Sequence, residues 1–169
     1  MTRLSVALPM PPDVIDVLCA LPRPPAPRVI WARPEQLMVK LRPLGHVDPG
    51  LVVPLVEALQ DELAGASPVT CTLGPRTCRL AGQWLAVPVS GVDELAAAVF
   101  AATVGIVPVT HPQPFRADVV VARGRAPARL AGVPVEATWV ADTVVVVADR
   151  SAPGRPRFEQ VGEVGLRPS

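Results

Sequence analysis

The chain has 169 residues, of which 50% are hydrophobic and 18% are charged, and its net charge at pH 7 is +1. This length allows one domain with a substantial core, and the apolar content excludes a chain that is disordered throughout. The near-neutral charge excludes a uniformly basic surface, so binding of a nucleic acid would require a local cluster of cations. No apolar run reaches the roughly 18 residues that a membrane-spanning helix needs.

The cysteine content does not indicate a metal site. The three cysteines are odd in number, and the spacing of Cys71 and Cys78 does not match that of zinc ligands. We therefore expect reduced thiols, no bound metal and no cofactor. The N-terminus enters strand-like sequence directly and lacks the layout of a signal peptide, so we expect a cytoplasmic protein. The sequence does not determine the oligomeric state.

In the first half of the chain, strand and helix patterns alternate. The pair Pro11 and Pro12 opens a helix, and the pair Asp48 and Pro49 opens another, since Asp caps free amides and Pro tolerates the first helical position. The elements expected here are a strand over 3–8, a helix over 11–21, a proline-rich loop over 22–27, a strand over 36–44 and a helix over 49–63.

The second half repeats the order of strand, helix and strand. Its expected elements are strands over 69–73, 78–80 and 84–89, a helix over 92–103, strands over 116–123, 133–140 and 143–148, and a tail over 151–166 that contains a closing strand. We expect an α+β fold in which residues 1–169 form a single domain of two interleaved lobes. Direct sequence identity between the halves is too weak to demonstrate a duplication.

Two of the expected strands carry the residues of greatest functional interest. The first reads Leu-Met-Val-Lys-Leu-Arg-Pro-Leu-Gly over 37–45, and strict alternation places Met38, Lys40 and Arg42 on one face, opposite an apolar face. Lys40 is the only lysine of the chain. The second strand, about 116–123, places Asp118 and Val120 on one face.

With their flanks, these two segments resemble the motif regions of the 2H phosphoesterase superfamily, and most closely the 2'-5' RNA ligase and RNA 2',3'-cyclic phosphodiesterase family. In that family each motif strand carries His-x-Thr/Ser. Here Met38 and Asp118 stand at the two His positions, and Lys40 and Val120 stand at the two Thr/Ser positions. The resemblance covers nearly the whole chain and implies two pseudo-symmetric lobes of antiparallel sheet, with outer helices, around a central cleft.

The resemblance also implies a chemistry for which this chain lacks the groups. In the family, one imidazole removes a proton from the attacking hydroxyl or water and the other protonates the leaving oxygen. Met38 has no proton to exchange, so half of the acid/base pair is missing. We therefore expect a catalytically degenerate protein whose cleft binds a nucleotide, an RNA end or another phosphorylated ligand.

Two roles remain open for Lys40 and Asp118. The ammonium of Lys40 would bind a phosphoryl oxygen, or it would form a salt bridge with Asp118 across the cleft, and the cost of desolvating either charge alone favours the salt bridge. Asp118 would serve as a base only with a cation beside it.

Other polar and aromatic residues are weaker candidates for the cleft. Arginine grips phosphate through parallel hydrogen bonds, but solvated strand-edge charge explains the arginines equally well. His46 and His111 lack the family spacing, and His111 is the better candidate for a cleft contact. The candidate ligand-binding residues are Lys40, Arg42, His111, Arg116, Asp118 and Arg123. The tryptophans Trp31, Trp84 and Trp139 would stack on a base or, more commonly, pack in the core.

Two alternative functions remain. One is an active cyclic phosphodiesterase or 2'-5' ligase-like enzyme that tolerates Met38 and uses Asp118 with Lys40. The other is a non-catalytic protein-interaction module, which the apolar composition would allow. An exposed apolar patch would favour the interaction module, whereas an open cleft lined by arginine would favour ligand binding.

Overall fold

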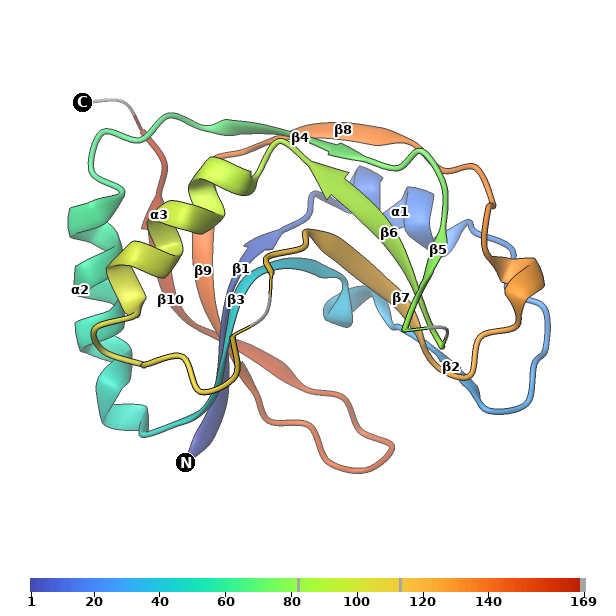
Figure 1. The fold of residues 1–169 in the computed structure, drawn as a ribbon, viewed down its shortest axis with the longest axis horizontal. Helices are drawn as coiled ribbons and strands as arrows, with labels where there is room; N and C mark the ends of the chain where they lie inside the picture. Colours follow the sequence, from blue (N-terminus) through green and yellow to red (C-terminus); the bar gives the residue numbers. More distant parts are fainter. Residues whose placement is uncertain (82, 113, 168–169) are drawn as a thin grey trace.

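The structure, a computed structural model, describes residues 1–81, 83–112 and 114–167 (Figure 1). Its α-helices are α1 (Pro12–Cys19), α2 (Val52–Glu62) and α3 (Asp93–Thr103). Its strands are β1 (Thr2–Pro9), β2 (Val29–Trp31), β3 (Met38–Val47), β4 (Val69–Leu73), β5 (Cys78–Leu80), β6 (Trp84–Ser90), β7 (Asp118–Gly124), β8 (Ala137–Ala141), β9 (Thr143–Asp149) and β10 (Phe158–Gly165). Within these ranges, no helix is long and apolar enough to cross a membrane.

The strands form two antiparallel sheets, one for each lobe. The first has the order β10-β9-β1-β3, and the second has the order β2-β7-β6-β4-β8, with β5 paired to β6. Each sheet therefore combines strands from both halves of the chain. The expected α+β fold with two lobes of antiparallel sheet is confirmed.

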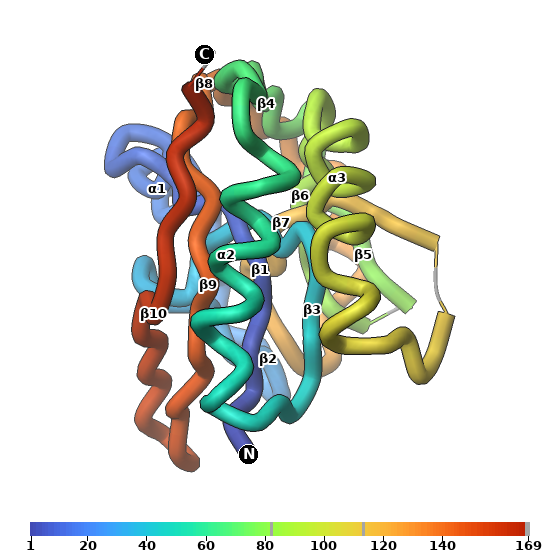
Figure 2. Tube along the Cα trace, turned by 90° about the vertical axis from the view of Figure 1, so that its left-hand side faces the viewer, coloured from blue at the N-terminus to red at the C-terminus, as the bar shows by residue number. Residues whose placement is uncertain are grey.

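The helices are divided unequally between the lobes. α2 and α3 lie side by side over the first sheet, α2 against β10 and α3 against β3 (Figure 2). In Figure 1 the first sheet lies between these two helices and the second sheet. α1 packs against β8 of the second sheet. Short 3-10 turns, such as η3 (Ala128–Leu130), accompany the helices.

The spacing of apolar residues explains how α2 covers the first sheet. On β1, Leu4, Val6 and Leu8 recur at every second position and are at most 1% exposed. On α2, Leu55 and Leu59 lie one helical turn apart and are fully buried in the same apolar cluster. This cluster includes residues of both sheets, so the lobes share one continuous core.

Two element boundaries differ from the sequence-based expectation for local reasons. The strand expected over 133–140 begins only at Ala137, because Pro134 has no N–H to donate and forms just an isolated bridge with Arg76. The helix expected from Pro49 begins as a 3-10 turn, in which an Asp48 side-chain oxygen accepts a hydrogen bond from Gly50 N at 2.8 Å. The predicted Asp cap is therefore present, and the regular helix starts at Val52.

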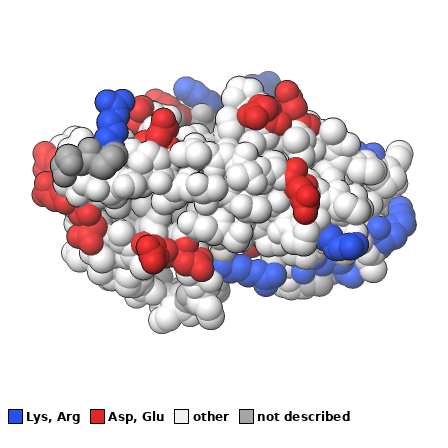
Figure 3. Space-filling model, turned by 90° about the horizontal axis from the view of Figure 1, so that it is seen from above, with Lys and Arg blue, Asp and Glu red and all other residues white. Residues whose placement is uncertain are grey.

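Figure 3 shows the charged side chains on one face of the molecule. On the face seen in Figure 3, acidic and basic side chains are both present, and basic ones are more numerous toward the end that lies away from α2. This distribution agrees with the net charge of +1 and leaves a local site, rather than a general basic surface, to attract an anion.

Candidate ligand-binding cleft

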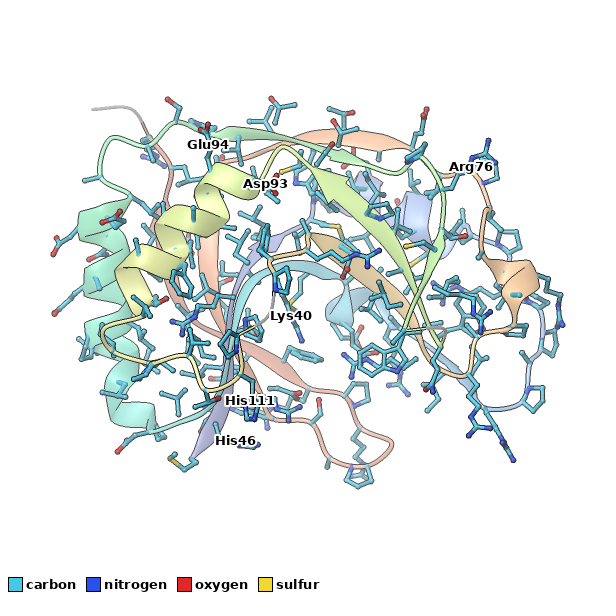
Figure 4. All side chains as sticks on the ribbon, viewed as in Figure 1. Lys40, His46, Arg76, Asp93, Glu94 and His111 are labelled. Carbon is cyan, nitrogen blue, oxygen red and sulfur yellow. The ribbon has the colours of Figure 1, made fainter. Side chains whose placement is uncertain are left out.

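A cleft of about 1390 Å³ lies between the two sheets. β3 and β7 contribute its central residues, and α3 and residues 108–111 and 114–116 line one side. All four motif positions, Met38, Lys40, Asp118 and Val120, line this one cleft. Lys40 lies near the middle of the molecule, between the lobes (Figure 4).

The two motif strands carry matching β-bulges. On β3, Lys40 pairs with Ala7 and Arg42 pairs with Val6, so Leu41 is the extra residue. On β7, Val120 pairs with Ala86 and Ala122 pairs with Leu85, which makes Val121 the extra residue. In each strand the bulge directly follows the second motif position. A bulge adds one residue and shifts the alternation of side chains beyond it.

The bulge explains why Arg42 does not offer its charge to the cleft as Lys40 does. Arg42 contributes to the cleft wall, but it is only 7% exposed. Its Nη1 donates to Thr103 Oγ1 at 2.7 Å, and its Nη2 donates to Val107 O. Its guanidinium also lies 5.3 Å from the ring centre of Phe100 on α3. The strict alternation expected through Arg42 was therefore wrong, and both terminal nitrogens hold α3 and its following loop against β3.

The bulge in β7 has the opposite effect on Arg123, which it turns toward the cleft. Arg123 is exposed, lines the cleft and stacks over Trp84, with 5.3 Å between its guanidinium carbon and the ring centre. Trp84 is 41% exposed and also lines the cleft. Core packing, the more common fate of a tryptophan, holds for Trp139, which is 7% exposed, but not for Trp84.

Lys40 carries a charge that the structure does not neutralise at close range. Among the described residues it has neither a hydrogen bond nor an ion pair within 4.0 Å. The Lys40 side chain is exposed to the cleft. The surrounding cleft walls still desolvate its ammonium in part and lower its pKa, the positive charges of Arg123 and Arg3 lower it further, and Asp149 opposes them. The cleft walls thus disfavour the charged form of this amine.

The Lys40–Asp118 salt bridge is absent from the described residues, so that hypothesis was wrong. The ion-pair partner of Asp118 is Arg116, with 4.0 Å between Arg116 Nε and Asp118 Oδ2. Burial raises the pKa of the Asp118 carboxyl, and Arg116 lowers it by a smaller amount. Arg116, two residues before Asp118, is therefore the ion-pair partner that we had expected Lys40 to be.

The two histidines lie in different places. His111 lines the cleft, and its Nδ1 is 3.2 Å from Thr110 Oγ1. His46 is not among the described residues that line the cleft. The strand expected over 36–44 extends through His46 to Val47, because His46 pairs with Arg3 of β1. The part of the chain that the structure describes has no cluster of His, Cys, Asp or Glu side chains that could hold a metal ion.

Comparison with solved structures identifies the architecture. The chain is similar to TT0787 of Thermus thermophilus, with a TM-score of 0.86 and 20% identity over 99% of each chain. It is also similar to E. coli LigT, solved in complex with 3'-AMP, with a TM-score of 0.82 and 17% identity over 98% of each chain. A structure described as a phosphoesterase has a TM-score of 0.81 and 18% identity, over 98% of this chain and 99% of its own.

The chain has the fold of the 2H phosphoesterases. No protein-family model and no curated protein sequence matches it. The likeness is therefore one of architecture, which by itself does not establish a function. The described lining of the cleft includes Met38, Lys40, Asp118 and Val120, the four residues that the sequence resemblance aligned with the family's motif positions.

The burial of Asp118 gives a pH-dependent prediction. A carboxyl whose pKa is raised in the folded state destabilises the protein above that pKa, where it must ionise, and has no such effect at pH values below both its folded and unfolded pKa. We expect Asp118→Asn to raise the melting temperature at pH 7 and to change it less at pH 3. Thermal unfolding at both pH values measures this difference. An equal shift in melting temperature at both pH values would mean that ionisation of Asp118 does not cause the change in stability.

Proposed function

We propose that the cleft binds a phosphorylated ligand, such as a nucleotide or an RNA end, and that the protein lacks phosphoesterase activity. The observation that carries this proposal is the convergence of Lys40 and Arg123 in one cleft, without an ion pair for either among the described residues. Two cations from facing strands repel each other, and an anion between them would relieve that repulsion.

The lining also suits a ligand that has an aromatic or apolar part. Trp84 lies beneath the guanidinium of Arg123, and Phe115, which is 43% exposed, lines the same cleft. Base stacking on an aromatic side chain contributes about 1–3 kcal/mol for each base in single-strand binders. LigT has been solved with 3'-AMP, ATP and NADP+, and ligands of this chemistry are the natural first probes.

The loss of activity follows from the groups that line the cleft. Phosphodiester cleavage by two histidines needs one group that accepts a proton and a second that donates one. Met38 supplies neither, so one member of the histidine pair has no replacement at its own position, and the carboxylate of Asp118 is paired with Arg116.

Calorimetric titration with 3'-AMP, inorganic phosphate and adenosine tests the binding proposal. We expect 3'-AMP and phosphate to bind and adenosine to bind at least about tenfold more weakly than 3'-AMP. Lys40→Gln and Arg123→Gln should each weaken 3'-AMP binding by about tenfold or more, since a hydrogen bond to a charged group contributes about 1.5–3 kcal/mol. Arg129→Gln is the matched control, because Arg129 is exposed and is not among the described residues that line the cleft. Equal binding by all variants, or none by the wild type, would contradict the proposal.

A second candidate is an enzyme with an altered acid/base pair. It is favoured by the presence of His111 and Asp118, both of which carry exchangeable protons, in the lining of the same cleft. Hydrolysis of a 2',3'-cyclic nucleotide by the wild type, abolished by both His111→Gln and Asp118→Asn, would favour this enzyme over a pure binding protein.

A further inference from the structure

The amine of Lys40 has an environment that differs from that of an ordinary surface lysine. Met38, its neighbour on the cleft face, packs against a small apolar cluster of Ala7, Val145 and Val147 that is separate from the main core. Ala7 is also the strand partner of Lys40. The ammonium therefore projects from an apolar floor into the cleft.

The charged groups around Lys40 come from three other strands. Arg123 on β7 and Arg3 on β1 favour the neutral amine, and Asp149 on β9 favours the ammonium. Burial acts in the same direction as the two arginines and is the largest influence on its pKa. Desolvation and a neighbouring cation are the two conditions that activate lysine amines as nucleophiles in proteins.

We propose that Lys40 forms a reversible imine with a small aldehyde that carries a phosphate group. This inference rests on the proposed function for the phosphate, which Arg123 would bind, and goes beyond it in assigning a covalent step to Lys40. The amine nitrogen attacks the carbonyl carbon, and the resulting carbinolamine loses its oxygen as water. The two amine protons leave with that water, so the step needs no oxidant or reductant.

A proton carrier for the loss of water is present in the same cleft. The carbinolamine oxygen must be protonated before it leaves, and a carboxyl whose pKa is raised by burial is protonated more often than an exposed one. Asp118 is such a group, and it lines the cleft together with Lys40. Asp118 is thus assigned the role of acid for dehydration of the carbinolamine.

Imine formation at Lys40 can be tested directly because the chain has a single lysine. Lys40 is its only lysine, so the α-amine of Met1 is the only other primary alkyl amine. The full chain would be incubated with pyridoxal 5'-phosphate at pH 7, reduced with borohydride and digested, and the labelled peptides would be identified by mass spectrometry. The matched reference is an exposed lysine introduced by Arg129→Lys, at a position outside the described lining of the cleft.

We expect Lys40 to be labelled faster than the reference lysine, because a lowered pKa raises the fraction of the amine that is unprotonated and nucleophilic at pH 7. Pyridoxal, which lacks the phosphate, should label Lys40 more slowly than pyridoxal 5'-phosphate does. In Arg123→Gln the two aldehydes should label Lys40 at similar rates. Asp118→Asn should slow labelling without weakening 3'-AMP binding to the same extent. Labelling of Lys40 at the rate of the reference lysine, or of Met1 alone, would overturn the inference.

Lys40→Arg keeps a positive charge at position 40 and removes the amine, so we expect this variant to give no label at that position. Binding of 3'-AMP and labelling of Lys40, both measured on the wild type, separate the two proposals. If the wild type binds 3'-AMP but Lys40 is not labelled, the imine fails and the proposed function stands. If neither binding nor labelling occurs, both fail.

Discussion

The variant that combines Met38→His, Lys40→Thr, Asp118→His and Val120→Thr is expected to hydrolyse a 2',3'-cyclic nucleotide that the wild-type protein leaves intact. All four positions line one cleft, and each motif strand has a bulge directly after its second motif position. Each positioned acid or base typically contributes about 10²–10⁴-fold to such a reaction. We therefore expect at least about 10²-fold more hydrolysis than with the wild type, measured by chromatography of the nucleotide products.

Two partial variants serve as controls for this gain of activity. Met38→His with Lys40→Thr restores only the first motif, and Asp118→His with Val120→Thr restores only the second. Each should stay at least about tenfold below the complete variant, because an acid without a base cannot complete the proton exchange. Activity in the wild type equal to that of the complete variant would show that the protein uses a different set of groups.

Replacement of Arg42 is expected to have the largest effect on stability. Arg42→Ala removes two hydrogen bonds from a buried guanidinium and leaves the Val107 carbonyl without this donor. Thr103 Oγ1 accepts from Arg42 and donates to Val99 O at 2.7 Å, so the change also reaches α3. We expect a loss of about 3 kcal/mol in the free energy of unfolding, measured by denaturant titration.

Arg42→Met and Arg129→Ala are the controls for this loss. The methionine keeps much of the apolar stem beside Phe100 but none of the donors, so it should lose nearly as much stability as the alanine. Arg129 is exposed, and Arg129→Ala should change the free energy of unfolding by about 0.5 kcal/mol or less. A small effect of Arg42→Ala would mean that α3 is held by its apolar contacts alone.

The sequence predicts the fold class because its apolar pattern and helix signals are local and strong. Leu4, Val6 and Leu8 of β1 lie at every second position and all join the main apolar cluster, and the Asp48–Pro49 pair begins a helix close to where it was expected. The resemblance to the family also led us to predict four motif positions, one pair on each of two strands. The structure places all four in one cleft.

Strict alternation could not predict which face of its strand a residue beyond the motif positions would occupy. Both bulges occur at ordinary strand residues, Leu41 and Val121, with no glycine to mark them. As a result, the hydrogen bonds that bury the guanidinium of Arg42 were not expected, and the stacking of Arg123 on Trp84 was missed. Arg123 itself was a candidate ligand-binding residue. Its contact with Trp84 depends on the pairing of β6 with β7, which the periodicity of the sequence does not reveal.

The choice of partner for Asp118 was also beyond sequence reasoning. Lys40 and Arg116 are both cations that the sequence places near Asp118, one across the cleft and one two positions earlier. Only the path of the backbone before β7 decides that Arg116 is 4.0 Å from the carboxylate. Distances of this kind depend on loops rather than on strand register, and loops lack a periodic signal.

The paired bulges also allow the four residues that line the cleft to be exchanged for others. Each bulge turns two consecutive residues, Leu41 with Arg42 and Val121 with Ala122, into the protein interior. The four cleft positions can therefore vary while the buried residues between and beyond them keep the core packed. A library that randomises only those four positions should yield mostly folded proteins with different cleft chemistry. A scaffold of this kind lets selection exchange one reaction for another without first having to rebuild the protein that carries it.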